Sequence, residues 1–122
     1  MKYLLVCLIL ITLFSCKQHH TILGVEVAKK ELRQALSEKS SEEQSPVKKI
    51  ISNEKAAVAI AEPMLFKIYG KDDIISEKPY EIYLIDSYWV LSGTLPEGMY
   101  GGTFLIILSA KDGRVIKLTH GK

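Results

Sequence analysis

The hydrophobic positions of this 122-residue chain fall into three patterns. Residues 3–11 form an unbroken apolar run, two later stretches repeat apolar residues every three or four positions, and the segments after residue 79 alternate or run apolar over short lengths. A period near 3.6 residues indicates an amphipathic helix, whereas a period of two or a short apolar run indicates a strand. The pattern therefore predicts a hydrophobic leader, then helices, then strands.

The first 16 residues have the layout of a secretory signal. Lys2 precedes the apolar run, which is too short to span a bilayer as a permanent helix. The run closes on Leu13-Phe14-Ser15-Cys16, which resembles the lipobox of bacterial lipoproteins, where the Cys sulfur receives diacylglycerol and the chain is cut just before it. We expect residues 1–15 to be a lipoprotein signal peptide and Cys16 to be a lipid anchor in the bacterial cell envelope. The alternative is an ordinary signal peptide with an incidental Cys.

The stretch from Val25 to Lys39 carries one narrow apolar stripe with a helical period. This short helix either docks on the domain or belongs to a stalk between membrane and domain, and the sequence leaves both open. Residues 40–46 hold Ser, Glu, Gln and Pro without a core-forming side chain, which is typical of a linker. We therefore expect residues 16–46 to be a lipid-anchored tether and residues 47–122 to be one compact domain.

A second and broader stripe, over residues 53–69, predicts the central buried helix. Asn53 can cap its first turn, and Gly70 can end it in a left-handed backbone conformation. Pro63 lacks an amide proton, so a kink is expected near it. Residues 71–73 are expected to continue the break after the helix.

Four segments after residue 79 are predicted to be strands. Residues 80–86 alternate in polarity, and residues 88–94 follow so closely that a hairpin is the simplest connection. Residues 103–109 are nearly all apolar, which indicates a central strand covered by the helix on one face and by a partner or a neighbouring segment on the other. Asp112-Gly113 is a strong two-residue turn signal before residues 115–119. One helix followed by four antiparallel strands predicts an α+β fold.

Composition narrows the function classes. The chain has 16 Lys and Arg against 14 Asp and Glu, interspersed, whereas a nucleic-acid binder would show a concentrated basic face. Cys7 lies in the apolar run and Cys16 is the predicted anchor, so the mature domain keeps no thiol for a disulfide, a nucleophile or a zinc site. His19 and His20 are adjacent and point to different sides, so no metal or other cofactor is expected.

Six short motifs occur in order between residues 50 and 122: Ile60-Ala61-Glu62-Pro63, Ile68-Tyr69-Gly70-Lys71, Tyr88-Trp89-Val90, Gly93-Thr94-Leu95-Pro96, Gly101-Gly102 and Thr119-His120-Gly121-Lys122. Together they resemble the nuclear transport factor 2 fold immunity proteins of bacterial polymorphic-toxin systems. The resemblance implies a cystatin-like cone, in which a curved antiparallel sheet of about four strands packs on a helix, and it implies binding of a cognate toxin. The resemblance implies no catalytic residue. The lipobox departs from the family pattern, because immunity to a cytoplasmic toxin needs no export. The anchor therefore implies either that the protein gives protection in the envelope or that the family domain is reused here for something else.

The loop between the second and third predicted strands holds the best candidates for partner binding. Glu97, Met99 and Tyr100 lie on a loop fixed between two strands, which can present side chains without disturbing the core. The glycines around them are expected to serve backbone angles or a β-bulge rather than phosphate binding, because no helix begins there. Trp89, the only Trp, is expected to be a core residue rather than a contact residue.

Three function classes follow from these observations. The first, and our prediction, is a non-catalytic, lipid-anchored envelope protein that binds a protein partner, with a toxin as the partner that the resemblance implies. The second is a small-ligand binder with a pocket at the open end of the cone, lined by Tyr80, Tyr83, Tyr88 and Trp89. The third is an enzyme that uses His120 with Asp72, Asp73 or Asp86, although the sequence places no nucleophile or ordered carboxylate beside that histidine.

Overall fold

The computed structural model describes residues 18–38 and 50–122. The predicted signal peptide, the Cys16 anchor and the predicted linker lie outside the described residues and stay predictions. The described elements are, in order, α1 (Val25–Ser37), α2 (Glu54–Tyr69), α3 (Lys71–Ser76), β1 (Glu81–Ile85), β2 (Tyr88–Ser92), β3 (Phe104–Ser109) and β4 (Val115–His120). Within these residues, no helix has both the length and the apolar character needed to cross a membrane.

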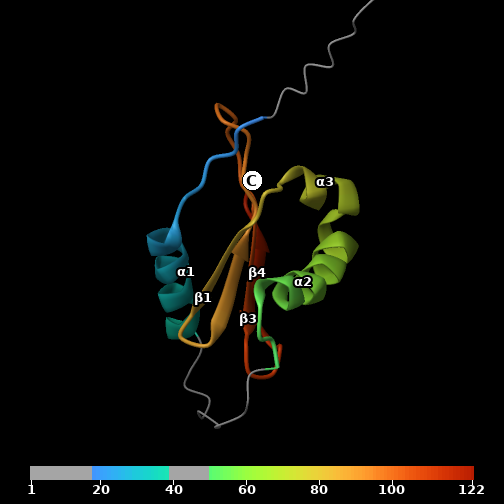
Figure 1. Ribbon diagram of the computed structural model, residues 1–122. Helices are drawn as coiled ribbons and strands as arrows, with labels where there is room; N and C mark the ends of the chain where they lie inside the picture. Colours follow the sequence, from blue (N-terminus) through green and yellow to red (C-terminus); the bar gives the residue numbers. More distant parts are fainter. Residues whose placement is uncertain (1–17, 39–49) are drawn as a thin grey trace, which may run out of the picture.

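The four strands form one antiparallel sheet in the order β1-β2-β3-β4, so each strand pairs with its neighbours in sequence. Asp86 and Ser87 join β1 to β2 with φ values of 48° and 66°, the left-handed pair of a tight hairpin turn. Gly113, with a φ of 74°, supplies the left-handed residue of the turn from β3 to β4. The predicted strands and the hairpin at Asp86-Ser87 are confirmed. The β3–β4 connection is longer than the predicted two-residue turn, because β3 ends at Ser109 and β4 begins at Val115. Both turns lie at one end of the sheet and the long β2–β3 loop lies at the other (Figure 1).

Helix α2 covers one face of the sheet and builds the larger core. The Asn53 side chain accepts the Ala56 amide at 2.8 Å, and the helix runs through Pro63 to Gly70, whose φ is 95°. The buried residues between helix and sheet are Ile51, Ala57, Ala61, Leu65, Ile74, Trp89, Leu91, Phe104, Ile106, Leu108 and Ala110. The α+β class, with a sheet packed on a helix and Trp89 in its core, is confirmed.

The segment after Gly70 differs from the prediction. A continued break was expected over residues 71–73, but α3 begins at Lys71 directly after Gly70. The positive φ of Gly70 redirects the chain, and Asp72 and Asp73 then lie in the first turn of α3, where carboxylates favour helix formation. Ile74 of this helix is fully buried in the core beside α2.

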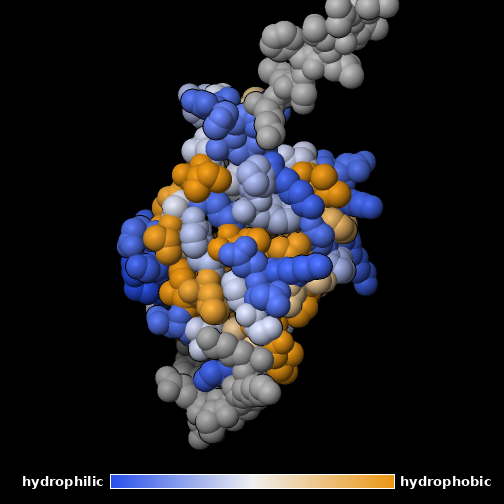
Figure 2. All heavy atoms as spheres, viewed as in Figure 1, coloured by the Kyte–Doolittle hydropathy of each residue, from blue (hydrophilic) through white to orange (hydrophobic). Residues whose placement is uncertain are grey.

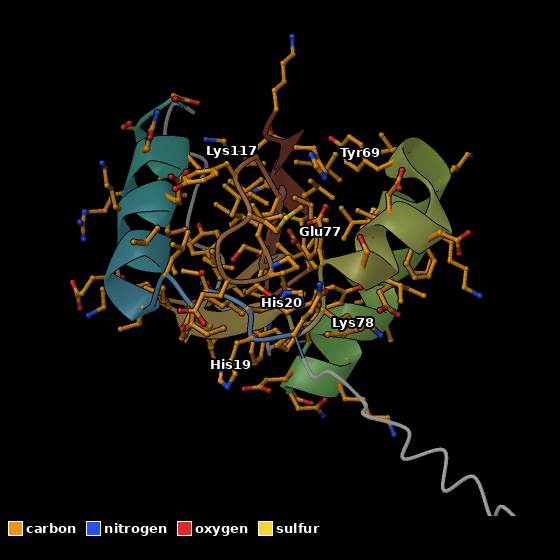
Figure 3. All side chains as sticks on the ribbon, turned by 90° about the horizontal axis from the view of Figure 1, so that it is seen from above. His19, His20, Tyr69, Glu77, Lys78 and Lys117 are labelled. Atoms are coloured by element: carbon orange, nitrogen blue, oxygen red, sulfur yellow. The ribbon has the colours of Figure 1, made fainter. Side chains whose placement is uncertain are left out.

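Helix α1 covers the opposite face of the sheet. Its apolar stripe packs with strand residues in a second core made of Ala28, Leu32, Ala35, Val90, Ile107 and Ile116. Figure 3, seen from above, shows α1 on one side of the strands and α2 with α3 on the other. The structure thus shows the docked form of this helix, and β3 is covered on both faces, with α1 as the neighbouring segment.

Candidate recognition surface

The β2–β3 loop presents its tip to solvent on a constrained backbone. The Met99 amide donates to the Pro96 carbonyl at 3.0 Å, which closes a turn whose third residue, Gly98, has a φ of 80°. Gly101 has a φ of 142°, which again suits glycine. Tyr100 is 98% exposed, Met99 is 61% exposed and Glu97 is exposed. All three residues predicted for partner binding are therefore accessible.

The N-terminal segment crosses the base of this loop. The Thr21 amide donates to the Leu95 carbonyl at 2.8 Å, the Glu97 amide donates to the His19 carbonyl, and His20 pairs with Pro96 in an antiparallel bridge. The loop is thus tied to a segment more than seventy positions away in the chain. Sequence reasoning missed this contact, because residues 19–23 show no strand period.

Side-chain bonds reinforce this crossing. The Thr94 hydroxyl donates to the Pro79 carbonyl at 2.7 Å and lies 2.7 Å from His20 Nδ1. The same ring nitrogen lies 3.0 Å from the Thr94 carbonyl oxygen. Figure 3 looks down on this end and shows His20 over the middle of the fold, near Glu77. His20 is therefore a structural residue that fastens the N-terminal segment.

Four exposed apolar or aromatic side chains border this end of the sheet: Ile22, Leu23, Met99 and Tyr100. Leu23 and Met99 also line a hollow of about 190 Å³ together with residues of the loop. Figure 2 shows apolar side chains gathered beside this end, between the loop and α1. We call these four residues the loop-end patch. Exposed apolar groups collected in one place indicate an interaction surface more strongly than single ones do.

Glu77 supports the base of the loop from inside. It is only 6% exposed, its Oε2 accepts the Phe104 amide at 2.8 Å, and its Oε1 lies 2.5 Å from His120 Nε2. Its backbone carbonyl accepts the Thr94 amide at 2.8 Å. A Cβ at Gly93 would lie 2.1 Å from Glu77 Oε2, so this glycine makes room for the carboxylate. Glu77 joins α3, β3 and β4 directly beneath the loop.

His120 was the candidate base of the enzyme hypothesis. It lines a hollow of about 370 Å³ with Asp73 and Ser76, but its carboxylate partner is Glu77 rather than one of the three predicted aspartates. Its Nδ1 donates to the Gly121 carbonyl at 2.7 Å, so both ring nitrogens have acceptors and neither can take a proton from a nucleophile. The Ser76 hydroxyl donates to the Asp73 carbonyl. This arrangement does not favour catalysis.

The surroundings of His120 stabilise its protonated form. Burial acts to lower the pKa of His120, but the Gly121 carbonyl, the Glu77 carboxylate and the more distant charge of Asp73 outweigh burial and raise the pKa above its ordinary value. A protonated ring donates from both nitrogens, which matches the two acceptors. His120 and Glu77 therefore form an ion pair that is partly shielded from water.

A second buried carboxylate fixes the start of α1. Glu81 is 5% exposed, and its two oxygens accept the amides of Leu23 and Gly24 at 2.8 and 2.7 Å. The Tyr83 hydroxyl donates to the same carboxylate at 3.0 Å. A hollow of about 220 Å³ lies here between the beginning of α1 and the sheet. Glu81 holds the N-terminal segment where it leaves the loop and enters the helix.

The aromatic residues of the ligand hypothesis do not line one pocket. Tyr80 and Trp89 pack in the core on the α2 side, and the Trp89 indole donates to the Ile51 carbonyl at 3.0 Å. Tyr83 and Tyr88 pack on the α1 side. The sheet separates the two pairs. In the described part of the chain, no group of three or more His, Cys, Asp or Glu residues could hold a metal ion.

Comparison with known proteins gives one family and two relatives. The family model described as NTF2 fold immunity protein matches residues 56–122, which is more than half of the chain. The uncharacterized protein YhhH of Escherichia coli K12 is 36% identical over 83 residues, or 67% of this chain and 65% of YhhH. The uncharacterized protein YbbC of the same strain is 35% identical over 77 residues, or 62% of this chain and 63% of YbbC. The chain thus spans just under two thirds of either relative's length. No solved structure matches it.

Proposed function

This chain belongs to the NTF2 fold immunity protein family, and from that membership we propose that it neutralises a toxin by binding it, without catalysis. The resemblance found in the sequence motifs, and with it the expected fold, is confirmed by the family match. The arrangement of His120 supports a binding role, since both ring nitrogens are already bonded to Glu77 and Gly121.

We propose the loop-end patch, together with Glu97, as the surface that binds the partner. One observation carries this choice: Met99 and Tyr100, which are adjacent on the loop, are 61% and 98% exposed. That loop is fixed by its turn, by the crossing segment and by Glu77, so its backbone loses little freedom when a partner binds. Aromatic side chains on such a base are typical of residues that dominate binding energy.

We also propose that the protein acts from a membrane of the bacterial envelope, held by a lipid on Cys16. The support is the signal-like segment that closes on Leu13-Phe14-Ser15-Cys16. The Cys16→Ala variant should then leave the membrane fraction or remain uncleaved, as fractionation and mass spectrometry would show. Processed Cys16→Ala protein that stays in the membrane would overturn the anchor.

The experiment for partner binding is affinity capture of the full-length, membrane-anchored protein from its own cells, followed by mass spectrometry. Capture with the wild type is compared with the double variant Met99→Ser and Tyr100→Ala. The matched control is Leu84→Ser, which changes a partly exposed apolar residue on β1, near the opposite end. We expect one stoichiometric toxin-like protein with wild type and control, and at least a tenfold loss with the double variant. Equal capture by all three would rule out the loop-end patch.

A further inference from the structure

Strand β1 is one edge of the sheet, and part of its backbone points away from the sheet. The Ala110 amide donates to the Ser87 carbonyl at 2.8 Å, so Ser87 and every second residue after it bond to β3. The alternate residues of β2 therefore bond to β1, where their register partners are residues 81, 83 and 85. The amides and carbonyls of Ile82 and Leu84 consequently face outward.

The β1 edge lacks the features that normally protect an edge strand. In the part of the chain that the structure describes, no hydrogen bond is made to the outward backbone groups of Ile82 and Leu84. The one charged side chain on β1, Glu81, is buried and bonded within its own chain, and Leu84 is 42% exposed. Edge strands are usually protected by charges, by proline or by a covering segment. An open and uncharged edge is a template for another strand.

The opposite edge of the sheet is protected against self-pairing. Strand β4 carries Lys117 and His120, and Arg114 and Lys122 lie directly before and after it. Positive side chains on an edge strand disfavour pairing with an identical strand, because like charges would face each other. Of the two edges, β1 is therefore the one suited to a second copy of this chain.

The β1 strand is complementary to itself when two copies run antiparallel about a two-fold axis at Tyr83. Ile82 of each copy then lies opposite Leu84 of the other, and each such pair exchanges both of its outward backbone hydrogen bonds. On the α1 face the two Tyr83 side chains meet at the axis, in the kind of pair where side chains lie closest. Aromatic pairs across strands are stabilising.

The charges at the two ends of the strand agree with this register. Asp86 of one copy comes opposite Tyr80 of the other, and Lys78 Nζ lies 5.3 Å from the centroid of the Tyr80 ring. The Lys78 side chain is 49% exposed, and Asp86 is exposed. An acidic end thus meets a basic end twice, which opposes a parallel arrangement and favours the antiparallel one.

We propose that two copies of this chain pair antiparallel through β1 and join their four-stranded sheets into one continuous sheet. The contact uses the same strand of both copies, so it closes after two and leaves only the positively charged β4 edges exposed. It involves no residue of the loop-end patch, which stays free in each copy for the partner of the proposed function.

The test is sedimentation equilibrium of the full chain in density-matched detergent. Leu84→Pro removes an outward amide while the bonds to β2 remain, and Leu84→Lys adds the charge that natural edges use. The matched control is Ile75→Lys on α3, where the replaced residue is 39% exposed and lies at the other end of the molecule from the β1–β2 turn (Figure 1). We expect dimers of wild type and control with equal affinity, and at least tenfold weaker dimerisation of both Leu84 variants. Circular dichroism checks that each variant is folded.

Amide hydrogen exchange of the wild type locates the contact. The amides of Ile82 and Leu84 should exchange more slowly as the protein concentration rises, whereas exchange in β4 should not change. Wild type that stays monomeric at every soluble concentration would overturn the dimer, as would equal dimerisation of Leu84→Lys and wild type or protection confined to β4. Toxin capture that is lost in Leu84→Lys, with unchanged sedimentation, would assign the edge to a strand of the toxin instead.

Discussion

Glu77 and His120 lie 43 positions apart in the chain, and one carboxylate oxygen of Glu77 lies 2.5 Å from Nε2 of His120. The other oxygen accepts the Phe104 amide. One buried side chain therefore joins the segment after α3 to the first residue of β3 and the last residue of β4. The β2–β3 loop begins and ends within this junction, so its position depends on Glu77.

The first prediction concerns this carboxylate. Glu77→Ala should lower the free energy of unfolding by about 1 to 3 kcal/mol, because the buried Phe104 amide would lose its acceptor. Urea unfolding measures the change. The control is Glu97→Ala on the exposed loop, which should stay within about 0.5 kcal/mol of the wild type. Equal midpoints for Glu77→Ala and wild type would contradict the role of Glu77.

The second prediction is a pH dependence of stability. The pKa of His120 is raised above its ordinary value of 6.5 in the folded state. Its stabilising contribution is therefore complete below the unfolded pKa and is lost as the pH rises through the folded pKa. The stability difference between wild type and His120→Gln should be larger near about pH 6 than near about pH 9 in urea titrations. A difference that grows with pH would have the wrong sign for a protonated His120.

The third prediction concerns the core. Trp89→Ala should lower the free energy of unfolding by about 3 to 5 kcal/mol, since the indole is 4% exposed and donates to the Ile51 carbonyl. Tyr100→Ala serves as the matched aromatic control and should change stability by less than about 0.5 kcal/mol. Thermal or urea unfolding separates them. A stable Trp89→Ala protein that no longer binds its partner would instead make Trp89 a contact residue.

The fourth prediction concerns the clamp on the N-terminal segment. Glu81→Ala removes the acceptor of the Leu23 and Gly24 amides, so amide hydrogen exchange should speed up over residues 23–37 and stay unchanged in α2. Glu31→Ala is the control, because it removes only the surface ion pair with Lys117, at 3.7 Å. Identical exchange in both variants would show that Glu81 does not hold α1.

The sequence predicts the regular elements well because each one has a local signal. The strand periods, the Asp86-Ser87 hairpin and the Asn53 cap all act within a few residues, and each appears in the structure close to its expected bounds. Asp112-Gly113 lies in the predicted connection, but that connection spans residues 110–114. Gly70 is predicted to end α2, and it does. The same residue, with its positive φ, also directly precedes α3, which the local signal does not predict. A local signal gives the conformation of a residue but not what the chain does next.

The candidate site is harder to predict because its bonds are distant in sequence. Glu77 lies in the polar run Glu77-Lys78-Pro79, which has the composition of a turn, and nothing near it points to Phe104 or His120. The crossing of residues 19–23 over the loop has no periodic signal either. The exposure of Glu97, Met99 and Tyr100 was predictable, because a glycine-rich loop between two strands faces solvent.

The second core also sets an order for folding. Helix α1 is the first described element to be synthesised, yet Ile107 and Ile116, against which its stripe packs, belong to the last two strands. The second core is therefore complete only after β4 has been made. The sheet, by contrast, is built only from strands that are neighbours in sequence, and local contacts of this kind favour fast folding. The N-terminal helix of the described fold therefore depends for its packing on the last described strand, which must be synthesised before the fold can close.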